Sequence, residues 1–267
     1  MKYSIITVNY NNKEGLRKTI ESVINQTFQD FEYIVIDGGS TDGSTDVLRE
    51  YDARINYWIS EPDGGIYQGM NKGILKASGD YLNFMNSGDC FFDNEVLQKV
   101  NSYSYDADII TGRDYHYSEE KQMSHTSIHP PRLSMITFFN ATLDHQSSFI
   151  KRKLFDNSLY QEDFHLVSDW IFFTEKIVSG NAKVQFIPDV ICRREEGGIS
   201  EQQSELNHKE INRWLHQYLP KGIYDDYATL ARLDKTSLYR LFIICENSFA
   251  RKLLTICIKI IYNLYKR

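Results

Sequence analysis

The 267-residue sequence is poor in cysteine and proline, with four and five of them, and has no apolar run of the roughly 20 residues that span a bilayer. The cysteines lie far apart without a CxxC pair, which argues against a zinc ribbon or a disulfide framework. The chain does not open on a basic segment followed by an apolar one, as a secretory signal would. We therefore expect a cytoplasmic protein with reduced thiols, and the mean hydropathy of −0.44 excludes a polytopic membrane protein.

The composition, with 42% hydrophobic, 25% charged and 13% aromatic residues, is that of a soluble globular protein. The net charge of −6 is divided unevenly along the chain. Residues 235–267 contain seven Lys or Arg and one acid, whereas the preceding 234 residues contain 23 basic and 35 acidic residues. An acidic body argues against a nucleic-acid partner, which would require a basic surface on the folded domain.

Short β-branched runs alternate with amphipathic segments over the first hundred residues, a pattern that predicts an α/β fold. Such alternation implies right-handed crossovers and a mainly parallel, Rossmann-like sheet with helices on both faces. The expected strands cover residues 3–8, 31–36, 55–59, 81–85, 108–112, 145–150 and 182–187. The expected helices cover residues 13–25, 45–51, 66–77 and 168–179, and the polar stretch 115–134 is expected to be an irregular loop over the site.

Polar residues gather directly after the first four expected strands, at residues 9–12, 37–42, 63 and 86–89. The carboxyl edge of an open α/β sheet is where such folds bind ligands. Neither GxxxxGK[ST] nor GxGxxG is present, which disfavours P-loop NTPases and Rossmann dehydrogenases. Asp37 either accepts hydrogen bonds from a nucleotide or belongs to the cap of the next helix, and spacing alone leaves both interpretations open.

Four strings occur in an order that resembles family 2 glycosyltransferases: TVNYN (7–11), IVIDGGSTDGS (34–44), EPDGGIY (61–67) and MNKG (70–73). The resemblance covers about residues 3–200 and is greatest to the branch that builds bacterial O-antigen and capsule. It implies a GT-A fold, inversion at the anomeric carbon, a nucleotide-sugar donor, here a UDP-sugar, and Mn²⁺ or Mg²⁺. The acceptor implied is a saccharide on a polyprenyl diphosphate.

The resemblance also implies roles for individual residues of the donor site. Thr7, Asn9 and Tyr10 match positions that flank the nucleotide, and Asp37 matches the acid that recognises the base. Asp63 and Asn71 match the loop and helix start that close over the donor.

The family's metal motif, which ends in two acids, corresponds here to NSGD at residues 86–89. Ser87 and Gly88 match donor-binding positions, and Gly88 replaces the first acid. Asp89 is then the only motif carboxylate for the divalent ion. The alternative for Asp89 is a solvated loop acid.

Asp169 matches the family's general base, which removes the proton from the acceptor hydroxyl. Its alternative is an acid that stabilises a helix N-terminus. His145 matches a recurrent family position that contacts donor phosphate or acceptor, although a lone histidine is more often structural. Arg193 and Arg194 match a segment that meets the diphosphate, with a surface salt bridge as the alternative.

We expect a catalytic domain over residues 1–215, with a donor half over about 1–112 and an acceptor half over about 113–215, and a helical basic extension over 216–267. Lys259 interrupts the apolar stretch of this extension, so it is not expected to span a bilayer. It is expected to lie on the anionic cytoplasmic face of the membrane. Packing on the domain or pairing in a homodimer is the alternative.

Two other functions fit the same sequence pattern. A sugar nucleotidyltransferase also uses the edge of an α/β sheet and a metal, but it carries a glycine-rich basic loop where this chain has NYNN at residues 9–12. An inactive nucleotide-sugar-binding module would keep the fold and lose the metal or the base. Asp89 and Asp169 argue against that module, whereas Gly88 leaves it open.

Overall fold

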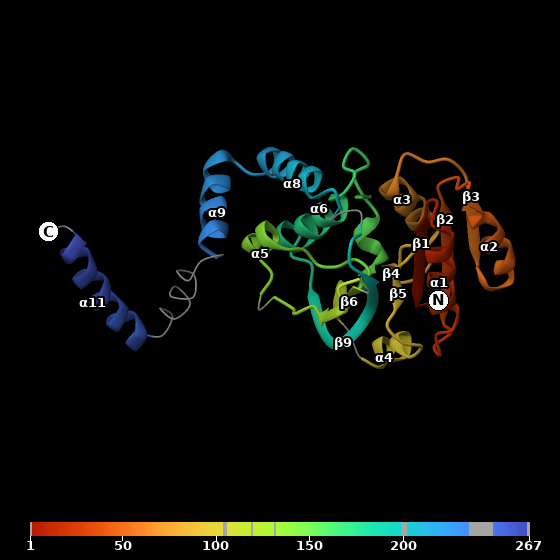
Figure 1. Ribbon diagram of the computed structural model, residues 1–267, viewed down its shortest axis with the longest axis horizontal. Coiled ribbons are helices and arrows are strands. Elements are labelled where there is room, and N and C mark those ends of the chain that lie inside the picture. The colour runs from red at the N-terminus through yellow and green to blue at the C-terminus, as the bar shows by residue number, and fades with distance from the viewer. Residues whose placement is uncertain are drawn as a thin grey trace.

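The computed structural model describes residues 2–103, 106–118, 120–130, 132–198, 202–234 and 248–265, whose arrangement is drawn in Figure 1. The expected extension therefore falls outside the described residues at 235–247, 266 and 267. The same holds for residues 199 and 200, the end of the family segment that begins at Arg193.

Four parallel strands form the first half of the sheet: β1 (Tyr3–Asn9), β2 (Phe31–Asp37), β3 (Tyr57–Ser60) and β4 (Tyr81–Phe84). β1 lies between β2 and β4, and β3 pairs with the outer side of β2. In this register Asn9 lies beside Asp37, and Asp37 lies beside Ser60. The carboxyl ends of the strands thus bring polar residues together, as the sequence predicts.

Beyond β4 the sheet is mixed rather than mainly parallel. It continues through β8 (Ser148–Lys151), β6 (Ile109–Ser118), β9 (Val184–Glu195) and β5 (Cys90–Phe91). β8 is antiparallel to β4 and β6, β9 is parallel to β6, and β5 is antiparallel to β9. β8 and β5 run opposite to the strands they pair with, so the regular crossovers on which the parallel prediction depended do not continue beyond β4.

The prediction of an irregular loop over residues 115–134 is partly wrong. β6 continues to Ser118 and forms an antiparallel pair with β7 (Met123–Thr126). In β6, Asp114, His116 and Ser118 are buried on alternate positions. The period of two is present, but polar residues occupy the buried face, so a hydrophobicity pattern does not reveal the strand.

Helices cover both faces of the sheet. Ile6 belongs to a hydrophobic cluster with Met70 of α3 (Ile66–Lys76), whereas the adjacent Ile5 belongs to a second cluster with Leu16 of α1 (Lys13–Ile24). This alternation follows from the pleat of the strand, which points successive side chains to opposite faces. The first cluster also includes α6 (Ser168–Thr174), and the second includes α2 (Ser44–Glu50) and α4 (Val96–Ser102).

The remaining helical segments are α5 (Met135–Asn140), α8 (Ser204–Tyr218), α9 (Lys221–Asp234), α11 (Ser248–Tyr265), the 3₁₀ turns η1 (Asp52–Arg54) and η2 (Arg152–Phe155), and the π turn η3 (Glu175–Ser179). Trp214 of α8 is buried against Trp170 of α6, with ring centroids 5.2 Å apart. Phe139 of α5 stacks on Tyr227 of α9. α8 and α9 therefore pack against α6 and α5 of the sheet domain.

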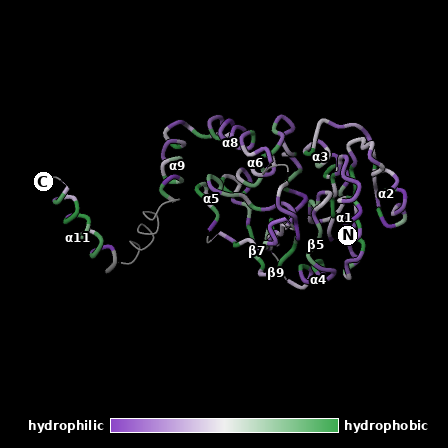
Figure 2. Tube along the Cα trace, viewed as in Figure 1, coloured by the Kyte–Doolittle hydropathy of each residue, from purple (hydrophilic) through white to green (hydrophobic). Residues whose placement is uncertain are grey.

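α11 lies apart from the sheet and its covering helices in Figure 1, and Figure 2 shows apolar residues along most of its length. Leu253, Ile256, Ile260 and Leu264 are each more than half exposed. Among the described residues, no helix is long and apolar enough to cross a membrane.

Candidate active site

A cavity of about 690 Å³ opens at the carboxyl edge of the parallel strands, and we call it the sheet-edge cavity. Its walls come from the ends of β1 and β4, the glycines after β2 and the loop 62–66. Of the predicted donor-site residues, four line it: Asn9, Tyr10, Asp63 and Ser87. Tyr10 is 68% exposed, so its aromatic side chain is accessible at this cavity.

The carboxylate of Asp37 is fully buried beneath this cavity and does not line it. Oδ1 accepts hydrogen bonds from the Asn9 amide (2.6 Å) and the Ser40 hydroxyl (2.6 Å), and Oδ2 accepts from the Ser40 N–H (2.9 Å) and the Ser60 hydroxyl (2.6 Å). Burial works to raise the pKa of Asp37, but these hydrogen bonds outweigh it and hold the pKa below its ordinary value. Asp37, at the end of β2, is thus hydrogen-bonded to the ends of β1 and β3. Recognition of the base by Asp37 stays a prediction.

We predict that Asp37→Asn lowers the free energy of unfolding by about 2 kcal/mol or more at neutral pH, because an amide nitrogen would face buried donors. Because folding lowers the pKa of Asp37, its ionised carboxylate stabilises the folded chain at a pH above the ordinary aspartate pKa of about 4. This stabilisation is lost as the pH falls from that value through the lower pKa of the folded chain. The difference in the free energy of unfolding between the wild type and Asp37→Asn should therefore be smaller at acid pH. Urea unfolding at pH 7 and pH 3 measures both effects, and equal stabilities at pH 7 would contradict the prediction.

Thr7 and Asn71 also lie beneath the surface rather than in the sheet-edge cavity. The Thr7 hydroxyl donates to the carbonyl of Met85 (2.7 Å). The side chain of Asn71 donates to the carbonyl of Tyr160 (2.9 Å) and accepts from its N–H (3.0 Å). Asn71 thus fastens α3 to the segment at Tyr160. A direct donor contact by Thr7 or Asn71 stays a prediction.

Asp169, in the first turn of α6, has hydrogen-bond partners on both carboxylate oxygens. Oδ1 accepts from the hydroxyl of Tyr67 (2.7 Å), and Oδ2 lies 2.8 Å from Nδ1 of His145. The other ring nitrogen of His145, Nε2, lies 3.1 Å from the amide nitrogen of Asn86. Burial works to raise the pKa of Asp169, but the bonds and charge of His145 and the bond from Tyr67 lower it overall.

A second cavity, of about 550 Å³, lies between α5, α6, α8 and α9, and we call it the helix-lined cavity. Asp144, His145, Asp169 and Arg194 line its polar end. Asn86 lines the sheet-edge cavity, so the contact between His145 and Asn86 joins a wall of one cavity to a wall of the other.

The model of the glycosyl transferase family 2 matches residues 4–179. This range includes the carboxyl ends of all four parallel strands and Asp169. The chain belongs to this family. An uncharacterised glycosyltransferase of Mycobacterium tuberculosis is 45% identical over 98 residues, 36% of this chain and 37% of the relative. Glycosyltransferase GlyA of Streptococcus pneumoniae is 28% identical over 90% of this chain and 32% of the relative. The chain therefore spans about a third of the length of these two relatives.

Solved structures share the GT-A fold with this family 2 chain. S. aureus TarS 1–349 in complex with UDP superposes with a TM-score of 0.63 at 18% identity, over 93% of this chain and 74% of that one. A mannosyltransferase from Pyrobaculum calidifontis, in complex with GDP-Man and Mn²⁺, gives a TM-score of 0.60 at 14% identity, over 97% and 80%. The α/β, GT-A class predicted from the sequence is thus confirmed.

The turn at residues 86–89, predicted from the resemblance to hold the metal, has a glycine in place of the first acid. Gly88 has φ +105°, a conformation that glycine adopts at little cost and an aspartate rarely adopts. Asp89 follows it, and its Oδ2 accepts a hydrogen bond from the side chain of Gln146 (3.1 Å). Burial raises the pKa of Asp89. A carboxylate short of compensating partners fits a divalent cation, which would restore its charge balance.

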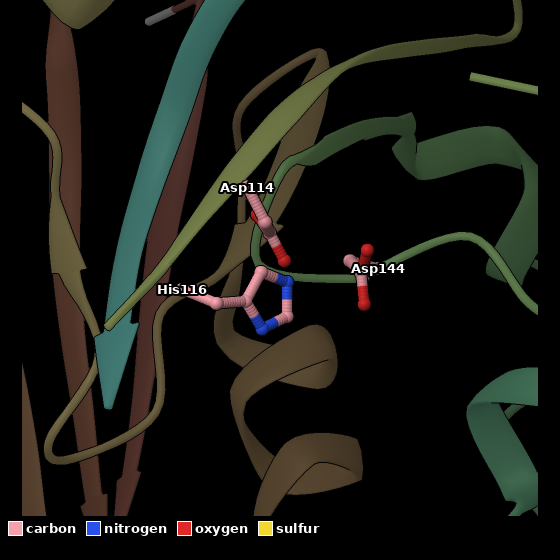
Figure 3. A group of neighbouring side chains, drawn as sticks. All are labelled: Asp114, His116 and Asp144. Carbon is pink, nitrogen blue, oxygen red and sulfur yellow. The ribbon is translucent and has the colours of Figure 1, made fainter. Parts of the chain in front are cut away.

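A second polar group near Asp89 was not foreseen from the sequence. Ligand-type atoms of Asp114, His116 and Asp144 lie within 4.8 Å of one another, and Figure 3 shows these side chains gathered between β6 and the neighbouring loop. Arg194 lies among them, with Nε 3.5 Å from Asp114 and a terminal nitrogen 3.3 Å from Asp144. The guanidinium supplies positive charge to this partly buried group, and contact of Arg194 with a diphosphate stays a prediction. The signal in the sequence is the alternation of Asp114 and His116 along β6.

Proposed function

We propose that this family 2 chain is an inverting glycosyltransferase that moves a sugar from a nucleotide-sugar donor, most readily a UDP-sugar, to a saccharide acceptor. The observation that carries the proposal is the pair of neighbouring cavities whose walls are joined by the contact between His145 and Asn86, beside Asp169. Inversion needs the donor and the acceptor on opposite sides of the anomeric carbon, and two adjoining cavities supply that arrangement. TarS, which shares the fold, has been crystallised with UDP and with UDP-GlcNAc.

The sheet-edge cavity suits the nucleotide. The exposed Tyr10 can stack on a base. Gly38 and Gly39 also line the cavity, and a side chain at either position would meet Asp63 or Pro62 of the opposite loop. Asp63 and Ser87 add polar groups on either side. The diphosphate would then lie toward Asp89, which would hold the divalent ion. Such an ion supplies charge neutralisation for the departing diphosphate.

The helix-lined cavity suits the acceptor. Its polar end can bind sugar hydroxyls, and apolar side chains of α5, α8 and α9 form the rest of its wall, including Phe138, Ile211, Leu215 and Tyr224. The acceptor hydroxyl approaches the anomeric carbon from this side, and Asp169 provides the basic group that the reaction requires.

A donor panel tests this function. The chain is incubated with UDP-, GDP- and dTDP-sugars and Mn²⁺, and release of nucleoside diphosphate is measured with and without saccharide acceptors. We expect release from one nucleotide class, with stimulation by an acceptor. A sugar nucleotidyltransferase would instead consume a nucleoside triphosphate, and an inactive module would bind a donor without release.

The acceptor class that we propose is a lipid-linked saccharide at the cytoplasmic membrane face, in the synthesis of a bacterial surface polysaccharide. α11 supports this because its polar residues recur at helical spacing on one face: Arg251, Lys252, Thr255, Lys259 and Asn263. The opposite face is apolar and exposed. Such a helix lies at a membrane surface, where each basic residue contributes roughly 1 kcal/mol toward anionic lipid.

We predict that removal of residues 248–267 abolishes sedimentation with anionic vesicles and leaves the thermal midpoint and donor turnover of the chain unchanged. Replacement of Arg251, Lys252 and Lys259 by Gln is the matched control and should weaken vesicle binding in a salt-sensitive way. Full-length protein that ignores anionic vesicles at low salt would contradict the membrane role. A lower midpoint or a dimer-to-monomer change on truncation would instead assign α11 to packing.

A further inference from the structure

We propose that Asp114, His116 and Asp144 bind a divalent transition-metal ion, of which Zn²⁺ is the representative, at a site distinct from the turn at residues 86–89. The ion holds β6 against the loop that precedes β8 and carries Asp144. The inference concerns metal binding alone and does not depend on the proposed function.

The first argument is the set of ligand atoms. One ligand-type atom from each of the three residues lies within 4.8 Å of the other two. Asp114 and His116 occupy alternate positions of β6, so the pleat of the strand points both to one face, and Figure 3 shows Asp144 approaching the same space from the neighbouring loop. Imidazole nitrogen and carboxylate oxygen bind Zn²⁺ at about 2.0–2.2 Å. An ion at that distance needs the three atoms roughly 3.4 Å apart, which small rotations of these side chains can supply.

The second argument is the carboxylate of Asp114. Its side chain is fully buried, and neither of its oxygens has a hydrogen-bond partner among the residues that the structure describes. Removal of a carboxylate from water without hydrogen bonds is costly, so buried carboxylates are normally paired or bound to a metal. Asp114 points an oxygen toward the space between His116 and Asp144, as a metal ligand would.

The third argument is charge. Arg194 approaches this group with Nε 3.5 Å from Asp114 and a terminal nitrogen 3.3 Å from Asp144, whereas a close charge-assisted bond is about 2.7–2.9 Å long. Burial and the charge of Asp144 raise the pKa of Asp114, and the guanidinium offsets only part of this rise. One guanidinium at these distances thus leaves two carboxylates short of positive charge, which a divalent ion supplies.

The place of the site in the fold indicates what the ion does. Asp144 directly precedes His145 and Gln146, whose side chains contact Asp169 and Asp89. An ion on Asp144 therefore anchors the segment that presents these two side chains. Its role is structural, because it holds residues 144–146 in place.

Titration with Co²⁺, whose visible absorption reports its bound ligands, tests the site. In Asp89→Ala, which removes the carboxylate of the 86–89 turn, we expect one equivalent of Co²⁺ to bind. Zn²⁺ should displace it and raise the thermal midpoint by about 3 °C or more. Adding His116→Gln or Asp144→Asn to this variant should weaken Co²⁺ binding by about a hundredfold or more and abolish the thermal shift.

His125→Gln, also added to Asp89→Ala, is the matched control. His125 stacks on His116 from β7, with ring centroids 4.7 Å apart, and is not one of the three ligands. This control should keep Co²⁺ affinity within about threefold of Asp89→Ala.

Asp89→Ala that keeps the wild-type circular dichroism spectrum but binds neither Co²⁺ nor Zn²⁺ would overturn the inference and leave the group as ion pairs with Arg194. Binding that survives both His116→Gln and Asp144→Asn would overturn it as well, because the ion would then lie on other residues. Should Asp89→Ala fail to fold, His116→Gln is compared with the wild type by metal analysis after dialysis against Zn²⁺. Loss of one equivalent is then expected, and an equal Zn²⁺ content would contradict the site. None of these measurements uses a sugar donor, so failure of the proposed function is seen separately in the donor panel.

Discussion

Asp169→Asn is expected to lower sugar transfer by about a hundredfold or more, with UDP affinity close to that of the wild type. The change keeps the shape of the side chain but removes the charge that faces His145 at 2.8 Å. An amide at this position cannot take up the proton of the acceptor hydroxyl, so the basic group that the reaction requires is lost. Donor affinity should survive because the sheet-edge cavity does not include Asp169.

Single-turnover transfer and calorimetric titration with UDP measure the two quantities separately. Tyr67→Phe is the matched control, since it removes the other hydrogen bond to Asp169 and leaves the carboxylate charged. We expect its effect to be at least tenfold smaller than that of Asp169→Asn. Collapse of UDP affinity in Asp169→Asn, with turnover of bound donor preserved, would make Asp169 a donor-binding residue.

Asp89→Ala is expected to abolish Mn²⁺-dependent turnover and to weaken binding of the donor diphosphate. Gly88 leaves no second acid in the motif, so Asp89 is the only motif carboxylate available to the ion. Without the cation, the negative charge that develops on the departing diphosphate is not neutralised. A Mn²⁺ titration of donor release, together with Mn²⁺ binding followed by electron paramagnetic resonance, measures the loss.

Asp93→Asn is a suitable control, because Asp93 lies four residues away and pairs with Lys99 outside both cavities. It should keep the wild-type Mn²⁺ dependence. Unchanged Mn²⁺-dependent activity in Asp89→Ala would place the ion on other residues and would contradict the assignment.

The parallel half of the sheet was predictable because the residues that specify each of its strands and helices are close together in the sequence. Each strand there is a short β-branched run, each connecting helix repeats its apolar residues at helical spacing, and polar residues mark each strand end. Asn9, Tyr10, Asp63 and Ser87 were therefore placed correctly at one edge from the sequence alone, and they line one cavity. Their contacts with a donor stay a prediction.

The second half of the sheet was less predictable because its strands pair with partners far along the chain. β6 pairs with β7, β8 and β9, and its buried face carries the polar residues Asp114 and His116. A hydrophobicity pattern cannot reveal a strand whose buried side chains are compensated by ion pairs instead of apolar packing. The antiparallel pairing and the cluster around Arg194 were missed for that reason.

The sequence by itself determined the α/β class, the first four strands, the polar edge of the sheet and the identity of the acids at 89 and 169. Only the tertiary structure decided what surrounds those acids. It placed Tyr67 and His145, 102 and 24 residues away in the chain, on the two oxygens of Asp169, and it buried Asp37 beneath the cavity. The physical reason is that periodicity records which face of an element is buried, whereas the partner of a buried charge is set by how distant elements pack.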